Sequence, residues 1–238
     1  MLKVWKQMNI DRKMKLLAIV LTILISASGM TAITYAAINN MPLPIRVACV
    51  GDSITQGSGY PLRLQLLLGS NYTVRNFGVS GSTVSLNSTR PYMNQTAFKK
   101  AEDFDPDIVV IMLGTNDANP DITLSEDNFE ADYAQLVTSF NGLDGNQSIW
   151  AVKSPPIFSN NSSYNNTLLA NLVLPKIDDV ANKLNLPTVD IYNAFSNHTD
   201  YFMDGVHPNP EGSVLIANNV YDAITLPDGS PDFFDSGS

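Results

Sequence analysis

The chain contains very little cysteine and histidine. Its 238 residues include one cysteine, Cys49, and two histidines, His198 and His207. A single thiol cannot form an internal disulfide or a cysteine-cluster metal site, and two imidazoles are too few for a three-histidine zinc site. Cys49 lies in an apolar run, where a free cysteine usually serves as a small core residue. We expect no metal and no cofactor. Because the chain has two histidines, any histidine chemistry must use His198 or His207.

Positive charge is also scarce and is concentrated at the N-terminus. The net charge is −9, from 14 basic and 23 acidic residues. Five basic residues and one acidic residue lie in residues 1–37, so the remainder keeps 9 basic and 22 acidic residues, a balance of −13. A domain this acidic repels nucleic acid and anionic membrane surfaces. The sequence therefore predicts no nucleic-acid partner.

Residues 1–37 have the features of an export segment. Lys13 and Lys15 precede the apolar run 16–25, which small residues follow. This order describes a secretory signal peptide. The apolar character continues to Ile33, and about 18 residues also suffice for an uncleaved membrane anchor; a buried core helix is the third alternative. Both export alternatives place the rest of the chain outside the cytoplasm, secreted or membrane-anchored, with this segment as its only membrane contact.

The remaining chain has the composition of one domain with two flanks. Residues 38–44 resemble a linker, residues 45–226 supply enough apolar segments for one core, and the acidic residues 227–238 are typical of a disordered tail. Sequons of the form Asn-x-Ser/Thr are candidate glycan acceptors in an exported chain. An Asn- and Ser-rich surface produces them equally well by chance, and both alternatives stay open. The eight sequons begin at Asn71, Asn87, Asn94, Asn146, Asn160, Asn161, Asn165 and Asn197.

Short apolar runs alternate with helical segments along this domain. We predict strands at residues 45–50, 72–77, 107–113, 148–152 and 188–191. We predict helices at residues 60–68, 98–104, 128–140, 168–184 and 211–224. Ser125 is a candidate cap for the third helix, and Pro175 should kink or divide the fourth. The alternation predicts an α/β fold, a parallel sheet with helices on both faces.

Ser53 follows the first predicted strand, in the stretch Val-Gly-Asp-Ser-Ile-Thr-Gln-Gly at residues 50–57. The carboxyl ends of parallel strands are where open α/β sheets bind ligands. Ser53 is either an ordinary turn serine or a nucleophile, and a nucleophile needs a base that a carboxylate orients. His207 has Asp204 three residues earlier, although it also fits a helix-entry residue that the backbone satisfies. His198 lies in a predicted exposed loop.

Three groups are candidates for stabilising the oxyanion that ester cleavage would create. They are the backbone N–H groups of Ser53 and Gly81 and the side-chain amide of Asn116, each of which follows one of the first three strands. Preorganised donors of this kind usually contribute the largest single catalytic effect. Gly81 also fits a glycine that only allows a positive φ, and Asn116 also fits a residue that only closes a turn.

Four sequence blocks, taken in order, resemble those of the SGNH or GDSL-type hydrolases. They are Gly-Asp-Ser-Ile-Thr at 51–55, the glycine-bearing stretch 76–83, Gly-Thr-Asn-Asp at 114–117 and Asp-Gly-Val-His-Pro-Asn at 204–209. The resemblance covers residues 45–225. It implies a flavodoxin-like, three-layer α/β/α sandwich with a five-stranded parallel sheet.

The same resemblance implies roles for individual residues. Ser53 would be the nucleophile, His207 the general base and Asp204 the carboxylate that orients it. The oxyanion hole would consist of Ser53, Gly81 and Asn116. Only residues 58–59 separate Gly57 from the next predicted helix, where many relatives have a longer loop. The short loop either opens the cleft or removes a substrate contact.

Within the family, residues 46–116 look most like carbohydrate O-acetylesterases, including sialate O-acetylesterase-like members. Residues 77–81 and 91–92 carry this finer match. We predict a serine ester hydrolase that removes a short acyl group, acetyl, from a small-molecule or glycan ester through an acyl-enzyme on Ser53. The alternatives are a lysophospholipase or thioesterase that acts on longer acyl chains, and a non-catalytic glycan-binding surface domain.

Overall fold

A computed structural model describes residue 15 and residues 43–121, 126–141, 147–161 and 163–226. The chain divides into two compact units, Met1–Leu43 and Pro44–Ser238, and the fold below is that of the second. The predicted Ser125 cap, the tail at 227–238, nearly all of the export segment and most of the linker lie outside the described residues. None of the described helices combines the length and the apolar character that crossing a membrane requires.

Five parallel strands form one sheet in the order β2-β1-β3-β4-β5. This is the flavodoxin-like strand order, and it confirms the predicted five-stranded parallel sheet. The strands are β1 (Ile45–Gly51), β2 (Tyr72–Gly78), β3 (Ile108–Met112), β4 (Ser148–Lys153) and β5 (Thr188–Asp190).

Both faces of the sheet are buried, which explains why the central strand β3 is apolar without interruption. Successive side chains of a strand point to opposite faces. In β1, Val47 and Cys49 join one hydrophobic core, while Ala48 and Val50 join the other. Cys49 is buried and makes no disulfide, in agreement with its predicted place in the core.

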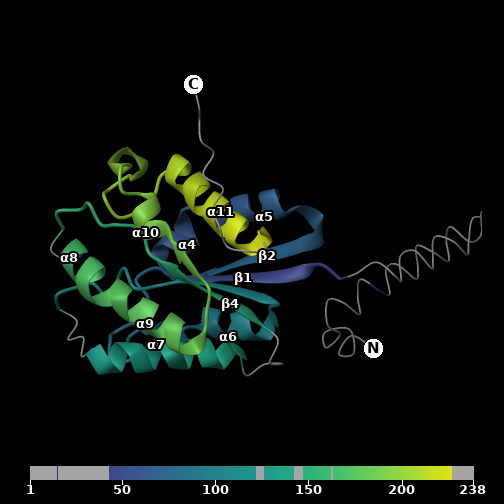
Figure 1. The fold of residues 1–238 in the computed structure, drawn as a ribbon, viewed down its shortest axis with the longest axis horizontal. Helices are drawn as coiled ribbons and strands as arrows, with labels where there is room; N and C mark the ends of the chain where they lie inside the picture. Colours follow the sequence, from purple (N-terminus) through teal and green to yellow (C-terminus); the bar gives the residue numbers. More distant parts are fainter. Residues whose placement is uncertain (1–14, 16–42, 122–125, 142–146, 162, 227–238) are drawn as a thin grey trace, which may run out of the picture. The chain divides into compact units, whose positions relative to one another are not determined.

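Helices cover both faces and complete the predicted three-layer sandwich. Helices α5 and α11 pack on one face, and α6, α7 and α9 pack on the other (Figure 1). The α-helices of the second unit are α4 (Ser53–Gly57), α5 (Tyr60–Leu68), α6 (Thr96–Asp103), α7 (Glu126–Asn141), α8 (Asn166–Leu168), α9 (Leu174–Leu184), α10 (Ile191–Ala194) and α11 (Pro210–Thr225). Shorter 3₁₀ turns are η1 (Gly69–Asn71), η2 (Tyr92–Asn94) and η4 (Thr199–Tyr201).

The fourth predicted helix is divided just before Pro175, which is one of the two outcomes expected for this proline. A π-helical turn, η3 (Leu169–Val173), joins α8 to α9, and the Leu174 N–H donates to Leu169 O across five residues. Proline has no N–H and clashes with the preceding turn of a regular α-helix. The wider turn ahead of Pro175 accommodates its ring, so the division into α8 and α9 takes the form of a change of helix type.

Two glycines let α4 pack against the ends of the central strands. A Cβ atom at Gly51 would lie 2.6 Å from Met112 O, and one at Gly78 would lie 2.3 Å from Gln56 N. No side chain fits at such distances from backbone atoms. The strand β1 lies between β2 and β3, where the order of the sheet reverses. A crevice at the carboxyl end of the sheet is expected at this point.

Candidate active site

Ser53 is the first residue of α4, which begins directly after β1. The Asp52 carboxylate caps this helix, since its Oδ1 accepts a hydrogen bond of 2.9 Å from the Ile54 N–H. A side-chain oxygen in this position satisfies a backbone donor that the first turn leaves free. The sharp change from strand to helix holds the Ser53 side chain at the carboxyl edge of the sheet.

The structure brings Ser53, His207 and Asp204 together in a row. Ser53 Oγ lies 2.9 Å from His207 Nε2, and His207 Nδ1 lies 2.7 Å from Asp204 Oδ2. Both distances are those of hydrogen bonds. Ser53 and His207 are 154 residues apart in the sequence, so only the fold creates this contact.

The negative charge of Asp204 determines which ring nitrogen of His207 carries the hydrogen. Burial raises the pKa of Asp204, but hydrogen bonds from the His207 backbone, the His207 ring and the Val206 backbone outweigh it and lower this pKa to about 2. An ionised carboxylate accepts hydrogen bonds and donates none. His207 Nδ1 must therefore donate to Asp204, which leaves Nε2 free to accept from the Ser53 hydroxyl.

A tight turn holds Asp204 and His207 in this geometry. Asp204 Oδ1 accepts from the backbone N–H groups of Val206, at 2.9 Å, and His207, at 2.8 Å. Gly205, directly after Asp204, has φ at +81°, in the left-handed region. Residues other than glycine rarely adopt this backbone conformation.

The three candidate oxyanion donors come from the loops after β1, β2 and β3. Neither the Ser53 N–H nor the Gly81 N–H has an acceptor among the residues that the structure describes. The Asn116 amide donates to Ser82 O at 2.9 Å and makes a long contact of 3.4 Å with Asp52 Oδ2. Asn116 thereby links all three loops, and one of its hydrogens is held only weakly.

Among the hydrogen bonds that the structure describes, the ring of His207 has none to Asp52, although its charge acts on Asp52. The environment of Asp52 is the opposite of that of Asp204. Its side chain is 1% exposed. Burial raises the pKa of Asp52 to about 7, and the negative charge of Asp117 also raises it. The ionised form of an acid is disfavoured in such surroundings.

His198 lies apart from this row of residues. Its ring stacks on Tyr201 with 4.2 Å between the centroids, at the start of η4. Of the two histidines, the structure therefore places only His207 against Ser53. Among the described residues, no cluster of three or more His, Cys, Asp or Glu side chains is arranged to hold a metal ion.

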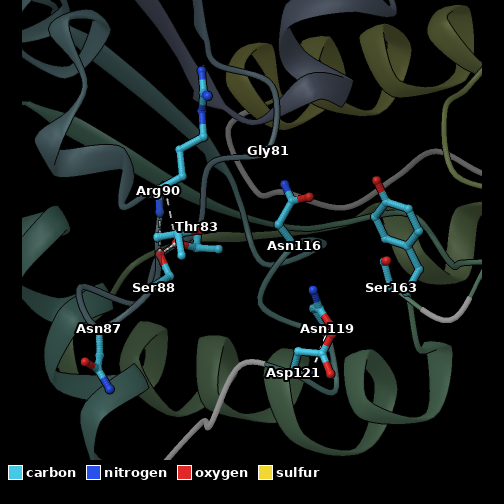
Figure 2. Close-up of a pocket in the computed structure, with 11 residues that line it drawn as sticks. Gly81, Thr83, Asn87, Ser88, Arg90, Asn116, Asn119, Asp121 and Ser163 are labelled. Carbon is cyan, nitrogen blue, oxygen red and sulfur yellow. Dashed lines mark hydrogen bonds between the residues drawn. The ribbon is translucent and has the colours of Figure 1, made fainter.

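A cavity of about 380 Å³ adjoins two of the three candidate oxyanion residues, Gly81 and Asn116 (Figure 2). Polar side chains make up nearly all of its lining. The other lining residues are Thr83, Asn87, Ser88, Thr89, Arg90, Asn119, Asp121, Ser163 and Tyr164. This volume falls in the range of small-molecule sites.

Sequence reasoning missed most of these lining residues. Burial raises the pKa of Tyr164, and the charges of Asp204 and Asp52 raise it further, so Tyr164 lies within reach of both carboxylates. It comes from a polar stretch without any period, so no sequence signal marks it. The loop at 84–90 likewise shows no pattern, yet its Val84 and Ser85 are buried.

Residues 49–215 match the family model of the GDSL-like lipase/acylhydrolases, and this match spans more than half of the chain. The chain belongs to the GDSL-like lipase/acylhydrolase family. The family that four sequence blocks predicted is thus confirmed, and it is a family of carboxylic ester hydrolases.

One curated relative of this GDSL-family chain is the acetylxylan esterase of Xylanibacter ruminicola. The two are 33% identical over 217 residues, which cover 79% of this chain and 45% of the relative. The chain thus spans less than half of the length of that protein.

Solved structures share the fold of the GDSL-family chain. A carbohydrate acetylesterase family member from Sinorhizobium meliloti has a TM-score of 0.63 at 23% identity, with 76% of this chain and 97% of that chain covered. An acetyl xylan esterase has the same TM-score at 21% identity, with 76% and 100% covered.

Proposed function

We propose that the chain is a serine ester hydrolase that removes an acetyl group from a carbohydrate ester through an acyl-enzyme on Ser53. One observation carries the proposal: Ser53 Oγ, His207 and Asp204 form a continuous hydrogen-bonded row, with distances of 2.9 and 2.7 Å. This arrangement activates a serine hydroxyl for attack on an acyl carbon.

The reaction proceeds in two steps. Ser53 Oγ attacks the carbonyl carbon while His207 Nε2 takes its proton, and the proton then passes to the departing alcohol. Water hydrolyses the acyl-enzyme in the same way, with His207 again as the base. The N–H groups of Ser53 and Gly81, together with the Asn116 amide, stabilise the negative oxygen of each tetrahedral intermediate.

Two observations support an acetyl ester of a sugar as the substrate. The curated relative with 33% identity is an acetylxylan esterase. The cavity beside Gly81 and Asn116 has a polar lining, which suits sugar hydroxyls and does not suit a fatty acyl chain, because apolar surface is stabilised by apolar surroundings.

A second candidate is hydrolysis of esters with longer acyl chains. Met203 and Phe158 are exposed by 68% and 38%, and both flank the catalytic turn. The Met203 N–H donates to His207 O at 2.9 Å, and the Phe158 N–H donates to Gly205 O at 2.7 Å. Apolar side chains at this rim offer contact to an acyl chain longer than acetyl.

Turnover of p-nitrophenyl esters tests the proposal. We expect Ser53→Ala to lower kcat for p-nitrophenyl acetate by roughly 10³-fold or more, because the nucleophile is lost. We expect His207→Ala and Asp204→Asn to lower kcat strongly with little change in KM. The control is Ser139→Ala on α7, where the hydroxyl donates only to Gln135 O of its own helix.

Equal rates for the natural chain and Ser53→Ala would refute the serine mechanism. An ester series from acetyl to palmitoyl separates the two candidates, since the proposal expects the highest kcat/KM at acetyl. Glycan binding without turnover of any ester would support the non-catalytic alternative instead.

A further inference from the structure

The cavity beside the catalytic row continues directly from the candidate oxyanion hole. Gly81 and Asn116 line it, and a Cβ atom at Gly81 would lie 3.5 Å from Arg90 Cδ. The stem of Arg90 therefore passes next to the backbone that would hold the oxyanion. An ester held in the oxyanion hole lies beside this cavity, which leaves room there for the group attached through its alcohol oxygen. The inference that follows rests on the proposed function and names the chemistry of that alcohol.

Two carboxylates fix the loop that forms one wall of the cavity. Asp117 accepts hydrogen bonds of 2.9 Å from the backbone N–H groups of both Val84 and Ser85. Asp132, on α7, accepts one of 2.8 Å from the Leu86 N–H. Charge-assisted hydrogen bonds of this kind are stronger than neutral ones. Although the loop has no regular secondary structure, its backbone is held in place where it leads to Arg90.

Among the described residues that line the cavity, Arg90 is the one that carries a positive charge. Among the described residues of the second unit, Arg90 and Lys100 are the two cations whose charged groups have no hydrogen-bond, ion-pair or ring partner. Figure 2 shows the Arg90 side chain extending away from Asn119 and Asp121. Its guanidinium is thus available to a ligand, whereas Lys100 does not line the cavity.

The lining combines groups that recognise an acidic sugar. A guanidinium binds a carboxylate through two parallel N–H···O bonds. The amides of Asn87 and Asn119 donate to and accept from hydroxyl groups, and the Asp121 carboxylate accepts from them. Because residues 38–238 carry a balance of −13, an anionic substrate requires a local cation for binding.

We propose that this cavity binds the sugar that carries the ester, and that Arg90 binds a carboxylate of that sugar. The enzyme then cleaves O-acetyl groups from acidic sugars in preference to those of neutral sugars.

A matched pair of substrates tests this preference. One is an O-acetylated methyl hexuronoside, and the other is the methyl hexoside with the same acetyl position and a CH₂OH group in place of the carboxylate. We expect the full chain to favour the uronoside in kcat/KM by about tenfold. Arg90→Gln should reduce this ratio to about one, and Arg90→Lys should retain part of it because the charge remains.

The ratio of kcat/KM for the uronoside to kcat/KM for the hexoside does not depend on the amount of folded enzyme. Partial misfolding of a variant therefore does not change this ratio. Lys100→Gln is the control, since it removes a partner-free cation outside the cavity and should leave both rates unchanged. An equal or lower kcat/KM for the uronoside with the natural chain, or an unchanged ratio in Arg90→Gln, would overturn the inference. Absence of turnover with these sugars and with p-nitrophenyl acetate would instead refute the proposed function.

Discussion

At the scale of single residues, Asp52 and Asp204 show how environment separates two carboxylates. Asp204 is partly open to solvent and accepts three hydrogen bonds from two neighbours, so it stays ionised across the physiological range. Asp52 is buried beside Asp117, and its pKa is raised to about 7. Asp204 can therefore orient His207, while Asp52 serves to cap α4 and to hold the Asn116 amide.

Replacing Asp52 by Asn should change how stability depends on pH. An unfolded Asp loses its proton near pH 4, whereas folded Asp52 keeps its proton up to about pH 7. The folded state thus binds more protons between these values, and the free energy of unfolding falls as pH rises through this window. Because Asn cannot ionise, we expect the melting temperature of Asp52→Asn to decline less between pH 5 and pH 8. Scanning calorimetry at both pH values measures this.

Asp222→Asn on the exposed side of α11 provides the comparison. It removes one carboxylate of the same type and leaves the buried pair Asp52 and Asp117 unchanged. The melting temperature of Asp222→Asn should therefore decline between pH 5 and pH 8 by as much as that of the natural chain. Parallel declines in all three proteins would show that Asp52 does not contribute to the pH dependence.

Residue types and spacing made Ser53, His207 and Asp204 candidates, and the resemblance to the SGNH hydrolases supplied their roles as a group. With two histidines in the chain, only His207 has a carboxylate three residues before it, and the structure places it against Ser53. Arg90 and Tyr164 could not be predicted in this way. Both lie in loops without periodicity and reach the cavity only because β2, β3 and β4 end at the same edge of the sheet.

At the scale of elements, the strands were predictable and the short helix α4 was not. A buried parallel strand is apolar over its whole length, which makes its signal strong. Helix α4 has five residues, and so short a helix shows no period of 3.6 residues. Its start is set by the Asp52 cap and by the absence of a side chain at Gly51 and Gly78, which are features of packing between distant segments.

The catalytic turn should depend on Gly205 more than on other glycines. Gly205 has φ at +81°, and a Cβ atom there would lie 2.6 Å from the backbone nitrogen of Ser159. Strain in this backbone region costs about 1–3 kcal/mol, and the clash adds to it. We expect Gly205→Ala to lower the free energy of unfolding by ~2 kcal/mol or more and to lower kcat, because Asp204 and His207 shift apart.

Urea unfolding and p-nitrophenyl acetate turnover measure both effects. Gly57→Ala in α4 is the control, because nothing lies within 4 Å of a Cβ atom at that position. Its unfolding free energy should stay within ~0.5 kcal/mol of the natural value. If both alanine variants were equally stable and active, the turn would not require glycine.

At the scale of the whole molecule, charge and composition divide the chain in the same place. Residues 1–37 carry five basic residues and one acidic residue, and the remaining chain has a balance of −13. An acidic, esterase-type domain behind a basic and apolar N-terminal segment fits an enzyme that meets glycans outside the cytoplasm. We propose export on this ground.

Two charge substitutions in the N-terminal segment test export. Leu21→Arg places a charge within the apolar run 16–25, which such a signal does not tolerate, whereas Val4→Arg adds the same charge ahead of the run. In a bacterial host, we expect esterase activity outside the cytoplasm for the natural chain and Val4→Arg, and within it for Leu21→Arg. The intact mass of the exported protein then separates a signal cleaved near Ala37 from an anchor that is retained. Equal activity of all three proteins in the cytoplasmic fraction would show that this segment does not direct export.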